Sequence, residues 1–395
     1  MKKNLLFVIN NLNCGGAEKA LISLLETIDY TAYNVDLLLF KHEGIFFSKI
    51  PEQVNLLEEP LEFKYFDMPI KAAIIDILKK GRLDIATSRL SAGIIFKTEG
   101  NQARCEQRVW KFISKPIRKL KKEYDVAIGY LEKNPIYFCL EKVNAKKTIG
   151  FIHNDYNKLG MDPTLDMPYF DKLDHIVTVS KECANVLKQQ FPMYQHKVSV
   201  MYNIVSPATI NNLSLETINL NKRVTNLVSV GRLNKQKGFD MAVEACKDLN
   251  ASGYQVNWLV IGEGEERIKL EQMIKDYHLE DQFILLGMKE NPYPYIKEAD
   301  IYVQPSRFEG KSIAIDEAKI LQKPIVVTNF STAKDQVNNQ ENGIVVDMNP
   351  ISISKGIQKL IDNQNLRRKF ERQLSIEHLG TEHEIEKLYE LIGAV

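Results

Sequence analysis

The second half of the chain alternates short apolar runs with amphipathic stretches of about 10 to 15 residues, and this alternation most strongly limits its possible folds. The apolar runs show no polar–apolar alternation, as expected for strands that helices cover on both faces. Strands are predicted over residues 227–230, 258–261, 283–286, 301–304, 325–328 and 344–346, with helices over 240–249, 265–277, 293–299 and 312–321. This pattern predicts a parallel α/β domain.

The first half begins with the same pattern. A strand is predicted over residues 5–9, a turn over 13–16 and a helix with one apolar face over 17–28. Residues 60–122 are predicted to be helical with a basic surface, and further strands are predicted over 35–40, 126–131, 148–152 and 176–179. Because 395 residues exceed the usual size of one hydrophobic core, we expect two domains, joined within 203–224.

Basic residues concentrate in the first half, although the net charge of the chain is only +1. Residues 79–122 contain 13 Lys or Arg and 3 Asp or Glu, which indicates an anionic partner. Here Trp110, Phe112 and Ile113 lie among cations, a mixture suited to lipid headgroups; the cations are Lys111, Lys115, Arg118, Lys119, Lys121 and Lys122. We expect an anionic membrane surface as partner and no nucleic acid. The alternative is an ordinary helix that buries Ile117 and Leu120.

The cysteines and the first residues bear on the location of the protein. Five widely spaced cysteines without a C-x-x-C pair disfavour a disulfide framework and a zinc site. The apolar run over residues 5–9 is too short for the core of a secretory signal. Together with the basic segment, these features predict a cytoplasmic protein that is peripheral on the inner face of the plasma membrane.

Loops that follow the strands are the places to search for a site, because open α/β sheets bind ligands at the carboxyl ends of their strands. The loop GRLNKQKGFD follows the predicted strand 227–230. Its Gly231 permits a tight turn, and Arg232 and Lys237 flank a loop before a helix N-terminus, which predicts an anion site. A solvated basic loop is the alternative reading.

The loop after the next strand contains Gly262 and Gly264, which let a backbone approach a planar ligand closely. Arg267 occupies the third glycine position of the G-x-G-x-x-G fingerprint. The segment therefore disfavours an NAD-dependent dehydrogenase.

The segment IYVQPSRFEGKSIAIDEAKILQKPIVVTN is predicted to form a strand, a loop, a helix and a strand. Glu309 lies in the loop and Glu317 eight positions later in the helix. The N–H groups at the helix start, from about Lys311 to Ile313, can bind a diphosphate, while the carboxylates accept hydrogen bonds from sugar hydroxyls. For Glu317 alone, a solvent-facing helical glutamate is the alternative.

Taken in order, these segments resemble the retaining glycosyltransferases of the GT-B architecture, often called family 4, of the bacterial surface-polysaccharide type. The resemblance spans nearly the whole chain, through GGAEKAL, HND after TIGFI, VTVS, YN, GRLNKQKGFD, VIGEGEER, the E-x7-E segment, PIVVTN and NGIVVD. It implies an α/β fold of two Rossmann-like domains that face each other across a donor/acceptor cleft. The expected domains are 1–203 and 204–375, with a C-terminal helix over 376–395 that packs back on the first domain.

The resemblance also implies roles for single residues. Arg232 and Lys237 would hold the donor diphosphate, Glu309 the transferred sugar and Glu317 the ribose. His153 would lie near the donor sugar and the acceptor. The donor-binding set is completed by Gly15, Gly16, Asn203, Gly231, Gly262, Gly264, Gly310, Lys311 and Ser312, and the catalytic set is His153, Glu309, Arg232 and Lys237. The sequence departs from the family at Lys311, where an apolar residue or glycine is common, and in the loop FSTAKD, which lacks glycines.

The implied reaction moves a hexose or N-acetylhexosamine from a nucleotide diphosphate sugar, with UDP favoured over GDP-mannose, to a lipid-linked or cell-surface glycan such as a capsule. We expect a same-face mechanism without a metal or cofactor, because no D-x-D motif and no candidate nucleophile occur and two cations can stabilise the leaving diphosphate. A nucleotide-sugar epimerase or hydrolase on the same fold is the first alternative. A non-catalytic partner of a glycosyltransferase pair is the second, and oligomerisation stays open.

Overall fold

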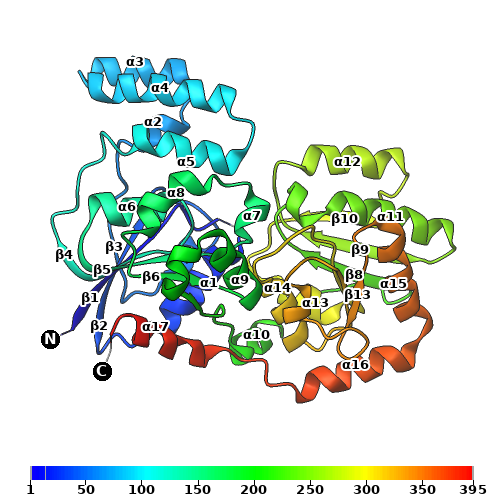
Figure 1. Ribbon diagram of the computed structural model, residues 1–395. Helices are drawn as coiled ribbons and strands as arrows, with labels where there is room; N and C mark the ends of the chain where they lie inside the picture. Colours follow the sequence, from blue (N-terminus) through cyan, green and yellow to red (C-terminus); the bar gives the residue numbers. More distant parts are fainter. Residues whose placement is uncertain (1, 14, 394–395) are drawn as a thin grey trace. The chain divides into compact units, whose positions relative to one another are not determined.

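The computed structural model describes residues 2–13 and 15–393, which form two compact units, each built on an open parallel sheet (Figure 1). The first unit comprises Ala17–Tyr202 with the N-terminal strand and the C-terminal segment from Glu384, and the second comprises Asn203–His383 together with residues 15–16. Among the described residues, no helix is long and apolar enough to cross a bilayer.

The sheet of the first unit has seven parallel strands in the order β3-β2-β1-β4-β5-β6-β7. Residues 5–9 of β1 are all apolar and fully buried, as expected for a central strand with helices on both faces. Strand order reverses between β1 and β4. The strands are β1 (Lys3–Ile9), β2 (Tyr33–Leu39), β3 (Asn55–Leu56), β4 (Glu123–Gly129), β5 (Asn144–Ile152), β6 (His175–Thr178) and β7 (Val198–Val200).

Several helices of the first unit begin at a polar residue whose side chain accepts a backbone N–H of the first turn, which satisfies donors that have no partner within the helix. Asn101 does this for α5 and Ser180 for α9. The helices are α1 (Gly16–Thr27), α2 (Lys64–Asp67), α3 (Ile70–Lys79), α4 (Leu83–Thr98), α5 (Gln102–Ile113), α6 (Asn134–Lys142), α7 (Tyr156–Leu159), α8 (Pro163–Phe170), α9 (Lys181–Gln190) and α17 (Ile385–Leu391), with 3-10 turns η1 (Phe47–Lys49) and η2 (Pro192–Lys197).

The C-terminal helix α17 packs on the first unit. The ring of Tyr389 stacks on Tyr33 with centroids 5.2 Å apart, and its hydroxyl accepts the Asp29 N–H at 2.8 Å. Lys147 Nζ donates to the Leu391 carbonyl at 2.8 Å. These contacts attach the segment from Glu384 onward to the N-terminal sheet.

Between β3 and β4 lie α2 to α5, and no strand occurs among these residues, as the sequence predicted. Helix α5 packs on α6 and α8 with its inner face and on α4 with its outer face, so α3 and α4 form the outermost helical layer (Figure 1). Trp110 and Ile113 on α5 are 0% and 3% exposed within the hydrophobic core. The expectation that they enter a lipid boundary is therefore wrong, because their helical phase points them inward.

The second unit has a six-stranded parallel sheet in the order β10-β9-β8-β11-β12-β13, so strand order reverses between β8 and β11. Its strands are β8 (Thr225–Val230), β9 (Val256–Ile261), β10 (Phe283–Gly287), β11 (Ile301–Gln304), β12 (Ile325–Thr328) and β13 (Ile344–Val346). Its helices are α10 (Pro207–Leu213), α11 (Phe239–Ala251), α12 (Arg267–Asp276), α13 (Tyr293–Glu298), α14 (Ile313–Ile320), α15 (Pro350–Asp362) and α16 (Gln364–Ile376), with 3-10 turns η3 (Lys235–Lys237), η4 (Ala333–Asp335) and η5 (Glu382–Glu384).

Every strand predicted from an apolar run is present, with small shifts at the ends. The prediction missed β3 and β7, which have only two and three residues. It also missed α10 inside the expected junction, a short helix that begins at Ser206 and Pro207. The four described cysteines are buried and form no disulfide, as predicted for that part of the chain.

Candidate active site

The predicted site residues in the loops after β8 and β11 lie where the strand order of the second sheet reverses. The loop after β8 and the loop after β11 leave neighbouring strands at the same edge of the sheet. In open α/β sheets this reversal point is where ligands bind, because the two loops diverge to opposite faces of the sheet and leave a crevice.

The loop after β8 is fixed by a hydrogen bond of the Asn234 side chain and by one glycine. The Asn234 side chain accepts the Lys237 N–H at 3.1 Å and starts η3. Gly238 then adopts φ +69°, and a Cβ there would lie 2.1 Å from the Pro305 carbonyl oxygen. Only glycine allows this approach of the two loops, which holds Lys237 beside the loop after β11.

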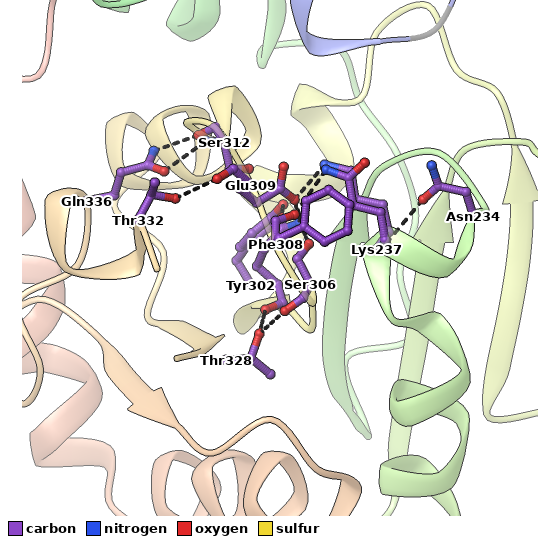
Figure 2. Close-up of polar contacts among 12 residues, drawn as sticks. Asn234, Lys237, Tyr302, Ser306, Phe308, Glu309, Ser312, Thr328, Thr332 and Gln336 are labelled. Carbon is purple, nitrogen blue, oxygen red and sulfur yellow. Dashed lines mark hydrogen bonds and ion pairs between the residues drawn. The ribbon is translucent and has the colours of Figure 1, made fainter. Parts of the chain in front are cut away.

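Glu309 is the centre of the hydrogen-bonded group in Figure 2. Its Oε1 accepts Lys237 Nζ at 2.7 Å, Ser306 Oγ at 2.6 Å and Gln304 Nε2 at 3.1 Å. The two charged side chains are 19% and 6% exposed, and an ion pair this buried persists only when further hydrogen bonds satisfy it. The structure thus brings together Lys237 and Glu309, which lie 72 positions apart.

The start of α14 is held by residues that the sequence analysis did not single out. The Gln336 side chain accepts the Ser312 N–H at 2.9 Å and donates to the Ser312 carbonyl at 2.7 Å, and Thr332 Oγ1 donates to the Glu309 carbonyl at 3.0 Å. The assignment of the Ser312 amide to a donor phosphate is therefore not supported, because that amide already has an acceptor. The only feature of the sequence that pointed to Thr332 and Gln336 was the loop FSTAKD, which contains Thr332 and lacks glycines.

Lys311, the residue that departs from the family pattern, is directed into the protein. Its ammonium forms an ion pair with Asp316, and the side chain is 8% exposed. The Gln336 amide donates to the same carboxylate at 2.9 Å. Lys311 therefore belongs to the network that positions the start of α14.

Glu317 does not face solvent. It is 2% exposed on α14, and its Oε1 accepts the Tyr293 hydroxyl at 3.2 Å from α13. The alternative of a solvent-facing helical glutamate is wrong, since Glu317 shares the buried face with Ile313 and Ile320.

The two glycines after β9 serve the packing of the protein itself. Gly262 has φ +153°, and a Cβ there would lie 1.9 Å from the Gly231 carbonyl oxygen. A Cβ on Gly264 would lie 2.3 Å from the Leu233 carbonyl oxygen. The two loops approach so closely that backbone contact, and not only a planar ligand, requires these glycines. Asn203, at the start of the second unit, accepts Thr381 Oγ1 with its carbonyl at 2.8 Å.

Three further predicted residues follow strands of the first unit's sheet in the sequence. Gly15 and Gly16 follow β1, and a Cβ on Gly16 would meet no described atom within 4 Å, so packing does not require this glycine. His153 follows β5 and is buried, and its backbone N–H donates to Glu132 Oε2 at 3.1 Å. Glu132, which the sequence analysis missed, also accepts Asn154 Nδ2 at 3.1 Å.

The His153 ring lies against Tyr130, with centroids 4.9 Å apart, and its buried Nε2 has no hydrogen-bond partner among the described residues. Burial lowers the pKa of His153 to about 4, outweighing the Glu132 carboxylate, which raises it. The imidazole is therefore neutral near pH 7.

We expect native stability to fall as pH falls from about 6.5 to about 4, because His153 takes up a proton only in the unfolded chain. The pKa difference corresponds to about 3.5 kcal/mol, at about 1.4 kcal/mol per unit. His153→Gln should remove this contribution. The difference between the unfolding midpoints of the native chain and the variant should shrink, or change sign, as the pH falls from neutral to about 4. A difference that stays constant over this range would show that His153 titrates normally.

Most cations of the basic segment are exposed, and Lys111 Nζ and Lys115 Nζ lie 5.0 and 5.4 Å from the centroid of the Phe112 ring. Lys122 instead pairs with the buried carboxylate of Asp36 at 2.8 Å. The Lys122 side chain is still 45% exposed, so all the cations predicted to contact a membrane keep exposed side chains: Lys111, Lys115, Arg118, Lys119, Lys121 and Lys122.

Comparison with known proteins shows which proteins the chain resembles. Residues 214–374 match the family model for glycosyl transferases group 1. The N-acetylgalactosamine-N,N'-diacetylbacillosaminyl-diphospho-undecaprenol 4-alpha-N-acetylgalactosaminyltransferase of Campylobacter jejuni is 25% identical over 368 residues, 92% of each chain. The capsular polysaccharide biosynthesis glycosyltransferase CapM of Staphylococcus aureus is 31% identical over 142 residues, 35% of this chain and 37% of CapM.

Two solved structures share the fold over the full length. HepE of Anabaena, in complex with UDP-glucose, has a TM-score of 0.68 at 16% identity and covers 100% of both chains. TarM of Staphylococcus aureus, in a complex that contains UDP, has a TM-score of 0.68 at 15% identity and covers 99% of this chain and 100% of TarM. The chain is a glycosyltransferase with the GT-B fold, and its second unit contains a domain of the glycosyl transferases group 1.

Proposed function

We propose that the chain is a retaining hexosyltransferase that moves a hexose or N-acetylhexosamine from a UDP-sugar to a lipid-linked glycan at the inner face of the plasma membrane. The observation that supports this most is the buried pair of Lys237 and Glu309 at the reversal point of the second sheet. The pair sets a phosphate-binding cation next to a carboxylate that can accept sugar hydroxyls.

The donor diphosphate binds to Arg232 and Lys237, the two cations of the loop after β8. HepE and TarM were solved with UDP-glucose and with UDP, which favours a uridine nucleotide. Negative charge grows on the diphosphate as it leaves, and the two cations stabilise that charge. The reaction therefore needs no metal ion, and we expect it to continue in the presence of EDTA.

Glu309 and Glu317 bind two different parts of the donor, the transferred sugar and the ribose. The three protein donors all reach Oε1 of Glu309, so Oε2 is the oxygen that we assign to a hydroxyl of the transferred sugar. Glu317 binds the ribose, since Tyr293 already orients its Oε1.

Transfer follows a same-face route. The bond from the anomeric carbon to the diphosphate breaks as the acceptor oxygen bonds on the same face, and the acceptor proton passes to the leaving phosphate oxygen. His153, neutral at physiological pH, contributes a hydrogen bond near the sugar and the acceptor. The Campylobacter jejuni relative is named for a diphospho-undecaprenol acceptor, which favours a lipid-linked acceptor here.

Glu317→Ala is expected to weaken binding of bare UDP by about 1.5–3 kcal/mol, because it removes hydrogen bonds to a charged group. Glu309→Gln should leave UDP binding nearly unchanged and lower transfer. Calorimetry with UDP measures the first effect and initial rates the second, with exposed Glu280→Ala as the control. Equal losses of UDP affinity in both variants would contradict the division of roles.

A thermal-shift series tests the proposed donor, since ligand binding adds to the stability of the folded state. UDP and UDP-sugars should raise the unfolding temperature more than GDP and GDP-mannose, with and without EDTA. A shift by GDP alone would overturn the choice of nucleotide. Isomerised UDP-sugar formed without an acceptor would support the epimerase instead.

A further inference from the structure

Large apolar side chains are exposed on the hairpin of α3 and α4 more than anywhere else in the described chain. Eight of the 17 exposed large apolar residues lie within residues 61–96. On α4, Leu83, Leu90 and Ile94 are 65%, 53% and 66% exposed at spacings of seven and four, which places them on one face. On α3, Ile75 and Leu78 form a shorter stripe of the same kind.

The opposite faces of both helices are already packed. Ala73 and Ile77 of α3 and Ile85 of α4 form a small buried cluster with Tyr65. The buried Arg89 guanidinium fixes α4 by donating to the Tyr65 and Met68 carbonyls at 2.8 and 3.0 Å. A surface helix that is apolar on both faces needs a second apolar environment for its outer face.

Cations border the outer faces. Lys71 is one turn from Ile75, and Lys97 is one turn from Ile94. Both, and Lys79 near the hairpin turn, are exposed and form no ion pair within the described chain. Long cationic side chains beside an apolar stripe suit the boundary between lipid headgroups and acyl chains.

A hollow of about 630 Å³ connects the hairpin with the basic segment after α5. Lys80 and Arg82 at the hairpin turn line it together with Arg118 and Lys119, and Leu61 forms part of its wall. Glu58, Glu59 and Glu62 also line it, so its charge is mixed. Two of the cations predicted from sequence to meet lipid, Arg118 and Lys119, therefore line the same hollow as the hairpin turn. The hairpin has the exposed apolar side chains that Trp110 and Ile113 do not provide.

We propose that the outer face of the α3–α4 hairpin, formed by Ile75, Leu78, Leu83, Leu90 and Ile94 with Lys71, Lys79 and Lys97, docks the protein on an anionic lipid bilayer. The inference rests on the proposed function only for the location of the acceptor. The surface is charged as an anionic bilayer requires, and a second copy of the chain would bring like charges together.

Flotation with vesicles tests this surface directly. The native chain should float with vesicles of equal parts phosphatidylcholine and phosphatidylglycerol at low salt, and less with phosphatidylcholine alone. A stripe variant carrying Gln at Ile75, Leu78, Leu90 and Ile94 should partition at least about tenfold less. A charge variant carrying Gln at Lys71, Lys79 and Lys97 should lose about a hundredfold on anionic vesicles. The matched control carries Gln at four exposed apolar positions of the second unit: Leu215, Ile268, Ile351 and Ile376.

Native-like flotation of the stripe variant would overturn the proposal, as would absence of native flotation. The proposal would also be overturned if the native chain bound no vesicles but formed a dimer that the stripe substitutions dissociate. That result would assign the surface to a second copy of the chain. All variants should transfer sugar to a water-soluble acceptor at the native rate. If the flotation results are as expected but the protein transfers sugar to no acceptor, the proposed function is refuted and the docking surface is still supported.

Discussion

Lys237→Ala is expected to lower kcat/KM for sugar transfer by a factor of about 100 to 1,000, the effect of removing one group that stabilises charge in a transition state. Lys237 Nζ lies 2.7 Å from Glu309 at the point where strand order reverses, so its loss also removes the cation next to the carboxylate that we propose binds the sugar. UDP affinity should fall by about 1.5–3 kcal/mol in calorimetry.

The fold should survive this change. Ser306 and Gln304 still donate to Glu309 in the variant, so the carboxylate keeps two hydrogen bonds. Lys235→Ala is the matched control, because Lys235 is an exposed lysine of the same 3-10 turn. Native kinetics in Lys237→Ala, or an equal loss in Lys235→Ala, would remove Lys237 from the site.

Gly262→Ala is expected to destabilise the second unit by about 3 kcal/mol or more. A Cβ there would lie 1.9 Å from the Gly231 carbonyl oxygen, and φ is +153°, a conformation that residues with a side chain rarely adopt. In a unit of this size the unfolding temperature should fall by about 6 to 12 °C.

Gly100→Ala is the control for this substitution, since a Cβ on Gly100 meets no described atom within 4 Å. Calorimetric scans of both variants beside the native chain measure the effect. An unfolding temperature of Gly262→Ala equal to that of Gly100→Ala would show that the loops after β8 and β9 do not approach as described.

The sheet strands and the family motifs were predictable because they depend on local patterns. Apolar runs without alternation identified every strand of four or more residues. The contact of Lys237 with Glu309 was not predictable from spacing, because it depends on β8 and β11 being neighbours in the sheet. Gln336 and Thr332 were missed for the same reason, since they reach α14 from a different loop.

The wrong predictions came from neglecting which face of a helix each residue occupies. Trp110 and Ile113 are three positions apart and share the buried face of α5 with Val109, a periodicity visible in the sequence. The prediction instead weighed their neighbourhood to lysines along the chain. The same reasoning explains Glu317, whose position four residues after Ile313 placed it on the buried face of α14.

The most direct test of the proposed transfer is a proton NMR spectrum of the product formed from a UDP-hexose or UDP-N-acetylhexosamine and a polyprenyl-diphosphate-linked glycan. The account predicts a new glycosidic linkage with the anomeric configuration of the donor, formed by the native chain and lost in Lys237→Ala. An inverted linkage, or sugar released or isomerised without transfer, would contradict it.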